Sequence, residues 1–190
     1  VLVTQLRVAA LIATLGTGVI LDGLTLWYTN GETVIFKSLG NPFIALGRTS
    51  LGEVQLPVVY AAVVTMLLWG MLKYTPAGRY MHAIGGNRDA TRLSGIRVER
   101  YVILAFVISG MTAAIAGIAH TARAGSATPS AGVTFLLPAF AAAFLGSATL
   151  RRGEFHIWGT VIGVYLIATG TAGFVILGAP FFTRQLFSGF

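Results

Sequence analysis

The sequence predicts an all-α integral membrane protein: a bundle of transmembrane helices with one short cytoplasmic helix between two of them. Of 190 residues, 55% are hydrophobic and only 10% are charged, and the mean hydropathy is +0.80. About a quarter of the residues of an aqueous globule are charged. Strict alternation of apolar and polar residues, typical of outer-membrane barrel strands, is absent from the apolar runs. The bilayer is therefore the expected solvent.

Runs without Asp, Glu, Lys or Arg place the spans, because a helix crosses the hydrocarbon core with roughly 20 such residues. The polar, Gly- and Pro-containing stretch 29–55 reads as a loop between the first two spans. The whole chain forms one partial transmembrane domain, 1–190. We expect spans at about 5–28, 56–74, 101–122, 133–150 and 157–179, with the start of another at 184–190.

Two features inside the spans predict local geometry. Small residues recur at helical spacing at Ser109, Ala113 and Gly117, and again at Gly159 and Gly163, which predicts close helix packing in lipid. Candidate helix breaks are Pro138 and the pair Gly170 and Gly173. Such breaks are tolerated at membrane depth only where protein or water satisfies the freed backbone groups.

The basic residues predict the orientation, because Lys and Arg in short connections stay on the cytoplasmic side. Nine of the thirteen belong to one set of alternate connections, namely Arg7, the segment 73–100, and Arg151 with Arg152. The opposite set holds Lys37, Arg48, Arg123 and Arg184. Segment 78–100 is therefore expected to be cytoplasmic.

Within that segment, a short helix is predicted from Arg88 to Ser94. Gly85 and Gly86 are expected to form a turn, and Asn87 is a favoured N-cap. Gly95 suits the left-handed position that ends a helix. A helix of about 10 Å is too short to be stable alone. Acidic lipid headgroups and a partner protein both remain open as what it contacts.

Several chemistries lack the residues they need. The chain has no Cys, and its three histidines (His82, His120 and His156) share no ligand spacing with the six carboxylates, so no metal site or cofactor is expected. No phosphate-binding G-x-x-x-x-G-K-S/T motif occurs, and no catalytic residues are expected. The scattered basic residues do not favour nucleic-acid binding. Spans two to five contain no ionisable residue at mid-membrane, and Asp22 is expected near the outer end of span one.

The run GRYMHAIGGNRDATRLSGI, 78–96, resembles the cytoplasmic coupling segment of permease subunits from the ribose and monosaccharide class of ABC importers. The similarity continues in IATLGT, 12–17, YTNG, 28–31, ISGMTAAIAGIAHTARAGSATPSAG, 108–132, and WGTVIG, 158–163. The chain departs from the family's Gly-rich pattern at 146–159, where two Arg appear.

The resemblance implies a multi-pass permease of the bacterial plasma (inner) membrane that moves a monosaccharide such as ribose and is not itself an enzyme. Its implied partners are cytoplasmic ABC ATPase subunits, a second permease subunit as a homodimer, a periplasmic or extracellular sugar-binding protein, and membrane lipid. An ion-coupled secondary carrier and a non-transporting scaffold are the alternatives. The residues expected to couple to the ATPase are Gly85, Gly86, Asn87, Ala90, Leu93, Ser94 and Gly95. For the substrate path we expect Ser126, Pro129, Gly132 and Pro138.

Overall fold

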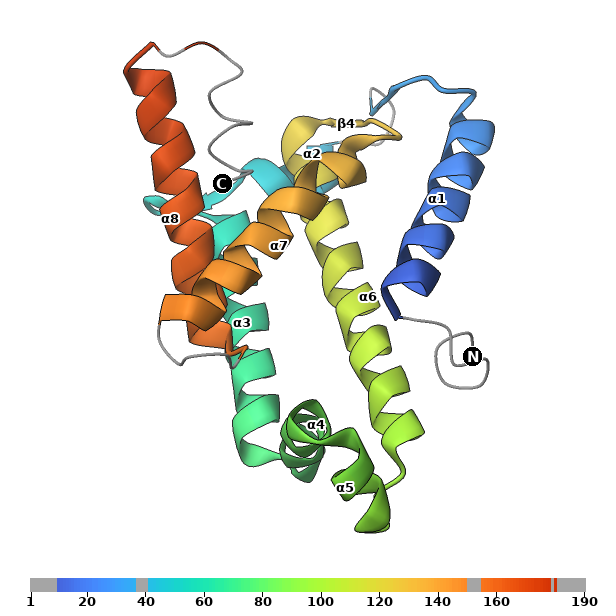
Figure 1. Cartoon of the computed structure of the whole chain (residues 1–190). Coiled ribbons are helices and arrows are strands. Elements are labelled where there is room, and N and C mark those ends of the chain that lie inside the picture. The colour runs from blue at the N-terminus through green and yellow to red at the C-terminus, as the bar shows by residue number, and fades with distance from the viewer. Residues whose placement is uncertain (1–9, 37–40, 150–154, 179, 181–190) are drawn as a thin grey trace. The chain divides into compact units, whose positions relative to one another are not determined.

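The computed structural model describes residues 10–36, 41–149, 155–178 and 180. Contacts divide the chain into two compact units, 1–129 and 130–190. Helices dominate both units (Figure 1), as the sequence predicts. The expected span at 184–190 and the basic pair Arg151 and Arg152 lie outside the described residues.

The first unit contains six helices and four two-residue strands among the described residues, and the second contains two helices. In chain order the elements are α1 (Ala10–Thr29), β1 (Val34–Ile35), α2 (Asn41–Arg48), β2 (Ser50–Leu51), β3 (Val54–Gln55), α3 (Leu56–Tyr74), α4 (Pro76–Gly86), α5 (Arg88–Leu93), α6 (Val98–Ala124), β4 (Ser126–Ala127), α7 (Ala131–Thr149) and α8 (Ile157–Ile176).

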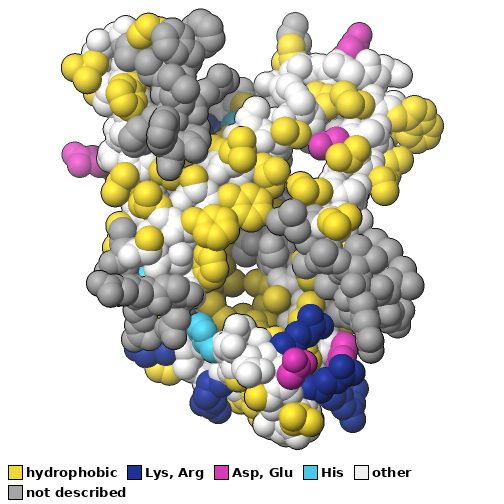
Figure 2. Space-filling view, in the orientation of Figure 1, with side chains coloured by type: hydrophobic (Ala, Val, Ile, Leu, Met, Phe, Trp, Pro, Cys, Tyr) yellow, Lys and Arg dark blue, Asp and Glu magenta, His cyan; other side chains and the backbone are white. Residues whose placement is uncertain are grey.

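Four helices of the described part, α3, α6, α7 and α8, are long and apolar enough to cross a membrane. Large apolar side chains on them are exposed, such as Leu67 at 67% and Met111 at 62%, because a membrane-facing surface is solvated by lipid. Figure 2 shows a group of Lys and Arg side chains around α4 and α5, at the end of the first unit where α3 ends and α6 begins.

At the opposite end of the first unit, the stretch read as a loop contains the helix α2, the small sheet of β2 and β3, and the strand β1. Helix α2 packs on the C-terminal end of α6, where Gly47 lies so close to the backbone of Ala122 and Arg123 that a Cβ would collide with it. The strand β1 pairs antiparallel with β4, Val34 with Ala127 and Ile35 with Ser126. These contacts join segments that a hydropathy pattern leaves separate.

The second unit is a tightly packed helix pair. A Cβ on Gly163 would collide with the carbonyl oxygen of Ala142, and one on Gly146 with the backbone of Gly159. The close packing expected of Gly159 and Gly163 is therefore confirmed. The matching stripe on α6 differs, because a Cβ on Gly117 would meet nothing within 4 Å.

The structure corrects two expectations about local breaks. Helix α7 continues through Pro138, and α8 continues through Gly170 and Gly173. Hydrocarbon offers no competing hydrogen-bond partner, so a helix persists through residues that would end it in water. Gly85 and Gly86 do not form a turn either, because α4 extends to Gly86 and the chain changes direction at Asn87.

Candidate functional site

The candidate site is the polar segment 75–99, which links α3 to α6 through α4 and α5. The direction of α4 is set where it begins, at Thr75. The Thr75 hydroxyl donates to the carbonyl of Met71 at 2.7 Å and accepts from the main-chain nitrogen of Gly78 at 3.2 Å. Pro76 follows in the first helical turn, where its missing N–H costs nothing.

Gly78 allows α4 to fold back on α3. It is buried, and a Cβ at this position would collide with the backbone of Leu72. A glycine is needed wherever two backbones approach this closely. The first residue of the recognised motif therefore has a structural role, which sequence reasoning had matched but not explained.

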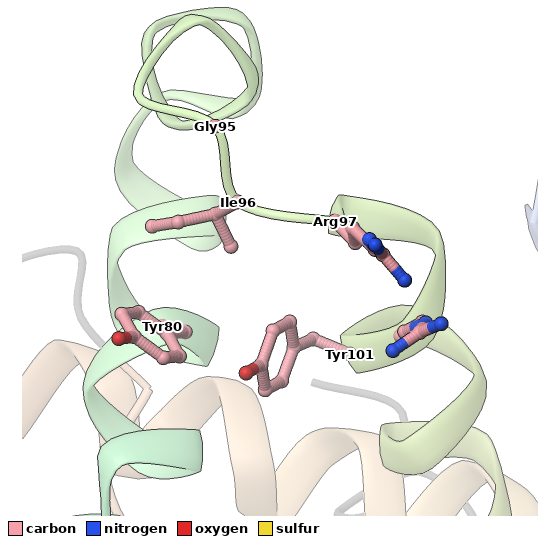
Figure 3. Close-up of a pocket in the computed structure, with 6 residues that line it drawn as sticks. Tyr80, Gly95, Ile96, Arg97 and Tyr101 are labelled. Carbon is pink, nitrogen blue, oxygen red and sulfur yellow. The ribbon is translucent and has the colours of Figure 1, made fainter.

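A pair of tyrosines connects α4 with α6. The rings of Tyr80 and Tyr101 meet edge to face with their centroids 5.2 Å apart. Figure 3 shows the two rings pointing toward each other across a shallow pocket, with Ile96 and Arg97 on its far side. The pocket has a volume of about 230 Å³ and is lined by Tyr80, Gly95, Ile96, Arg97, Arg100 and Tyr101.

Asn87 begins α5 as the sequence predicts. Its side-chain oxygen accepts from the main-chain nitrogen of Ala90 at 3.0 Å, which satisfies one of the donors that a helix start leaves unpaired. On the inner side of α5, Thr91 is only 6% exposed, and its hydroxyl donates to the Asn87 carbonyl at 2.7 Å. The cap and the buried threonine together fix which side of α5 faces inward.

Gly95 ends α5 as expected. Its φ of +81° lies in the left-handed region, which glycine enters without a steric penalty. Just before it, the Ser94 hydroxyl donates to the carbonyl of Ala90 at 3.0 Å. An ion pair of 3.2 Å between Arg92 and Glu99 then links α5 to α6. Both side chains are well exposed, so this pair adds little stability.

The seven expected coupling residues thus divide by position. Asn87, Ser94 and Gly95 shape the helix, whereas the others face away from the unit. Leu93 is 90% exposed, and Ala90 is exposed too. A Cβ on Gly85 or Gly86 would meet nothing within 4 Å. The outward surface of the segment therefore consists of one large apolar side chain, Leu93, beside the open backbone at Gly85 and Gly86.

The sequence analysis assigned no role to the residues that support this surface: Gly78, Thr91, Val98, Glu99 and Tyr101. Val98 is 1% exposed at the start of α6. A Thr-Pro-x-Gly start is a recognisable helix-capping pattern and could have revealed the entry into α4. The contacts of Thr91 and Val98 carry no comparable signal.

The four residues expected on the substrate path fall in different units. Ser126 is half-buried in β4, opposite Ile35 of β1, and Pro129 closes the first unit. Gly132 is exposed at the start of α7, and Pro138 is half-buried inside the same helix. Ser126 and Pro129 thus belong to the first unit, and Gly132 and Pro138 to the second.

His156 has a structural role that the sequence left open. Its Nδ1 accepts from the main-chain nitrogen of Gly159 at 3.0 Å and so caps the start of α8. Among the described residues, no group of three or more His, Cys, Asp or Glu side chains could hold a metal ion.

The fold is that of a multi-pass helical membrane protein with a structured polar segment between two spans. Its family follows from comparison: the chain belongs to the family described as the branched-chain amino acid transport system / permease component, which matches residues 1–190. The chain is therefore a multi-pass segment of a plasma (inner) membrane transport permease.

The relatives confirm the resemblance to sugar import permeases. The chain is 39% identical to the ribose import permease protein RbsC of Escherichia coli strain K12 over 98% of this chain and 59% of the relative. For RbsC of Bacillus subtilis the identity is 37%, over 99% and 58%. For the D-allose transport system permease protein AlsC of Escherichia coli it is 35%, over 87% and 50%. The chain thus spans about half the length of these relatives. No solved structure matches it.

Proposed function

We propose that these 190 residues belong to the membrane-spanning permease subunit of an ATP-driven ABC importer that moves a monosaccharide, such as ribose or a related sugar. Relatives with this range of identity are named for import of ribose, allose and xylose. The observation that carries the proposal is the outward surface of α4 and α5. It is built around Leu93, which is 90% exposed on a helix whose inner side is fixed by Asn87 and Thr91.

In this proposal a separate ATPase subunit hydrolyses ATP, and the permease is not an enzyme. A helix of six residues cannot hold its shape alone, and Leu93, which is 90% exposed at its end, offers a partner an apolar side chain to cover. ATPase subunits are that partner. A second permease copy and an external sugar-binding protein complete the importer, and α5 transmits the motion of the ATPase.

Membrane lipid is a further proposed partner. Arg97 and Arg100 line the pocket between α4 and α6, and no ion pair involving either is found in the described part of the chain. Basic side chains beside the cytoplasmic end of a span attract acidic headgroups. At the end of α3, the Lys73 ammonium lies 4.6 Å from the ring centroid of Trp69, an arrangement typical of the membrane interface.

The test places a large side chain at two positions of this surface, Gly86 and Ala90, that carry a small side chain or none. In proteoliposomes with the full-length permease, its ATPase and its binding protein, Gly86→Trp and Ala90→Trp should reduce ATP-dependent uptake of D-ribose at least tenfold. ATP hydrolysis should lose its stimulation by the loaded binding protein, because α5 can no longer seat. The matched control, Leu67→Trp, adds bulk to a side chain that is 67% exposed on α3 and should transport normally.

Normal uptake by both Trp variants would refute coupling through this surface. Uptake that needs a Na⁺ or H⁺ gradient and no ATP would favour the ion-coupled carrier instead. An assembly without sugar uptake under either driving force would favour the scaffold.

A further inference from the structure

The pocket between α4 and α6 has the walls of a site for a compact anion. Arg100 and Tyr101 lie three and four residues after Arg97, so the three side chains share one side of the start of α6. Tyr80 faces them from α4, with its ring centroid 5.2 Å from that of Tyr101 (Figure 3). The pocket volume of about 230 Å³ is below the roughly 300–1,000 Å³ of sites that enclose drug-sized ligands. It therefore fits a headgroup rather than a larger molecule.

Both arginines of the pocket are available to bind an anion. No ion pair or side-chain hydrogen bond of Arg97 or Arg100 is found in the described part of the chain. The main-chain N–H groups of Ile96 and Arg97 have no acceptor there either. The carboxylate of Glu99 lies 3.2 Å from the guanidinium of Arg92 and is thus already paired. The pocket therefore offers donors and positive charge, and none of its lining residues is acidic.

This set of donors matches a phosphate group. The N–H groups of a guanidinium form a planar fork that pairs with two oxygens of a phosphate. Tyr80 and Tyr101 each carry a hydroxyl group that can also donate. An acidic phospholipid such as phosphatidylglycerol has a net negative charge on its phosphodiester, whereas in phosphatidylcholine the choline cation offsets that charge. Two arginines without a carboxylate therefore favour the acidic headgroup.

The pocket lies where phospholipid headgroups are expected. Tyr101 begins the uncharged run of α6, residues 101–122, and Arg100 directly precedes it. At the neighbouring end of α3, the Lys73 ammonium lies 4.6 Å from the ring centroid of Trp69 and 5.2 Å from that of Tyr74. Aromatic residues with Lys or Arg beside them mark the membrane surface. Both spans thus leave the hydrocarbon at the level of this pocket.

We propose that the pocket between α4 and α6 is a binding site for the phosphate group of an acidic phospholipid, held by Arg97 and Arg100. The proposal rests on the lipid contact of the proposed function and deepens it, because it replaces a general attraction with a defined site. A headgroup bound there touches both α4 and α6. Acidic lipid therefore holds together the two helices that carry α5 between them.

The test compares two pairs of arginines in the full-length permease solubilised in detergent. Phosphatidylglycerol with a fluorescent acyl chain is titrated onto each protein. Arg97→Gln combined with Arg100→Gln should weaken its binding at least tenfold. The matched control combines Arg79→Gln with Arg88→Gln, which removes the same charge from exposed positions of the same segment outside the pocket. The control should bind phosphatidylglycerol almost as tightly as the wild type.

An equal loss of binding in the two double variants would overturn the pocket and leave only a general attraction of the basic segment. Equal binding of phosphatidylcholine and phosphatidylglycerol by the wild type would overturn both. Arg97→Lys combined with Arg100→Lys keeps the charge but loses the planar forks, so its affinity should be intermediate. Lipid binding that disappears when the ATPase subunit is added would also refute the proposal, since the ATPase would then occupy the pocket.

Hydrogen exchange on the wild-type permease gives a test that needs no variant. Phosphatidylglycerol should slow exchange in the segment 94–101, where the N–H groups of Ile96 and Arg97 are without an acceptor. Unchanged exchange there would contradict the site. The soluble ester sn-glycerol 3-phosphate, at the same concentration, should displace little lipid; full displacement would identify a soluble phosphate ester as the occupant and overturn the lipid. No sugar or ATP is used, so a failure of sugar import would refute the proposed function without affecting these results.

Discussion

The guanidinium of Arg48 caps a helix 75 residues further along the chain: its Nε donates to the carbonyl oxygen of Arg123 at 3.1 Å. Its Nη2 donates to the carbonyl of Ala124 at 3.3 Å. The last four carbonyls of a helix have no partner inside it, and a cation there also complements the helix dipole. One side chain of α2 therefore completes the end of α6.

We expect Arg48→Ala to lower the free energy of unfolding by about 1–2 kcal/mol, because two charge-assisted hydrogen bonds are lost. Arg48→Lys should fall between the two proteins, since an ammonium cannot form the fork of a guanidinium. The measurement is thermal unfolding in detergent. Arg88→Ala, at an exposed position on α5, serves as the control and should change little. An unchanged melting temperature for Arg48→Ala would contradict the capping role.

We expect Gly163→Ala to destabilise the pair α7 and α8 by about 1–3 kcal/mol, because the added methyl group would overlap the carbonyl of Ala142. Gly173→Ala in the same helix is the matched control. A Cβ there meets nothing within 4 Å, so this change should be neutral or slightly stabilising. Both proteins can be compared by thermal unfolding in detergent. Equal effects of the two changes would argue against the close contact.

We expect Asn87→Ala to loosen α5, since the loss of a helix N-cap costs about 1 kcal/mol. Asn87→Ser keeps an oxygen that can accept from the main chain and should restore most of the effect. Hydrogen exchange at the Ala90 amide reports the change directly, because that N–H is the donor to the cap. Exchange that is equally slow in Asn87→Ala would rule out the cap as what holds α5.

We expect Leu93→Ala and Val98→Ala to have opposite consequences. The Leu93 side chain is 90% exposed, so its loss should leave the melting temperature in detergent unchanged and weaken binding of the ATPase subunit about tenfold. Val98 is 1% exposed, and its truncation should cost about 1–3 kcal/mol of stability. Binding is measured by titrating the ATPase onto the solubilised permease. A lower melting temperature for Leu93→Ala would show that this side chain packs within the permease.

The helices that cross the membrane could be predicted because their signal is local and strong. For α3, the apolar run and its boundaries already coincide with the helix Leu56–Tyr74. The short helix α5 could be predicted equally well, because Asn87 and Gly95 begin and end it through contacts and backbone geometry within a few residues of their own positions. Each of these features depends on neighbours in the chain.

Predictions from helix-breaking residues inside the spans were wrong, because Pro and Gly end helices in water more readily than in a membrane. Pro138, Gly170 and Gly173 would weaken a helix in solution, yet α7 and α8 run through them. The stretch 29–55 reads as a plain loop for another reason, because its helix and strands are held by contacts with residues distant in the sequence. Nothing in its composition predicted that Gly47 would meet the backbone of Ala122 or that Ile35 would pair with Ser126.

The sequence by itself determined the membrane as solvent, the short capped helix and, through the motif at 78–96, the family. Only the tertiary structure decided which residues of that motif face outward and which support it from below. Leu93 and Thr91 are two positions apart in the same six-residue helix, yet one is 90% and the other 6% exposed. Helical geometry already places the two side chains on opposite sides of α5, but which of them is buried depends on the packing of α4 and α6 against α5, and no local pattern in the chain encodes that packing.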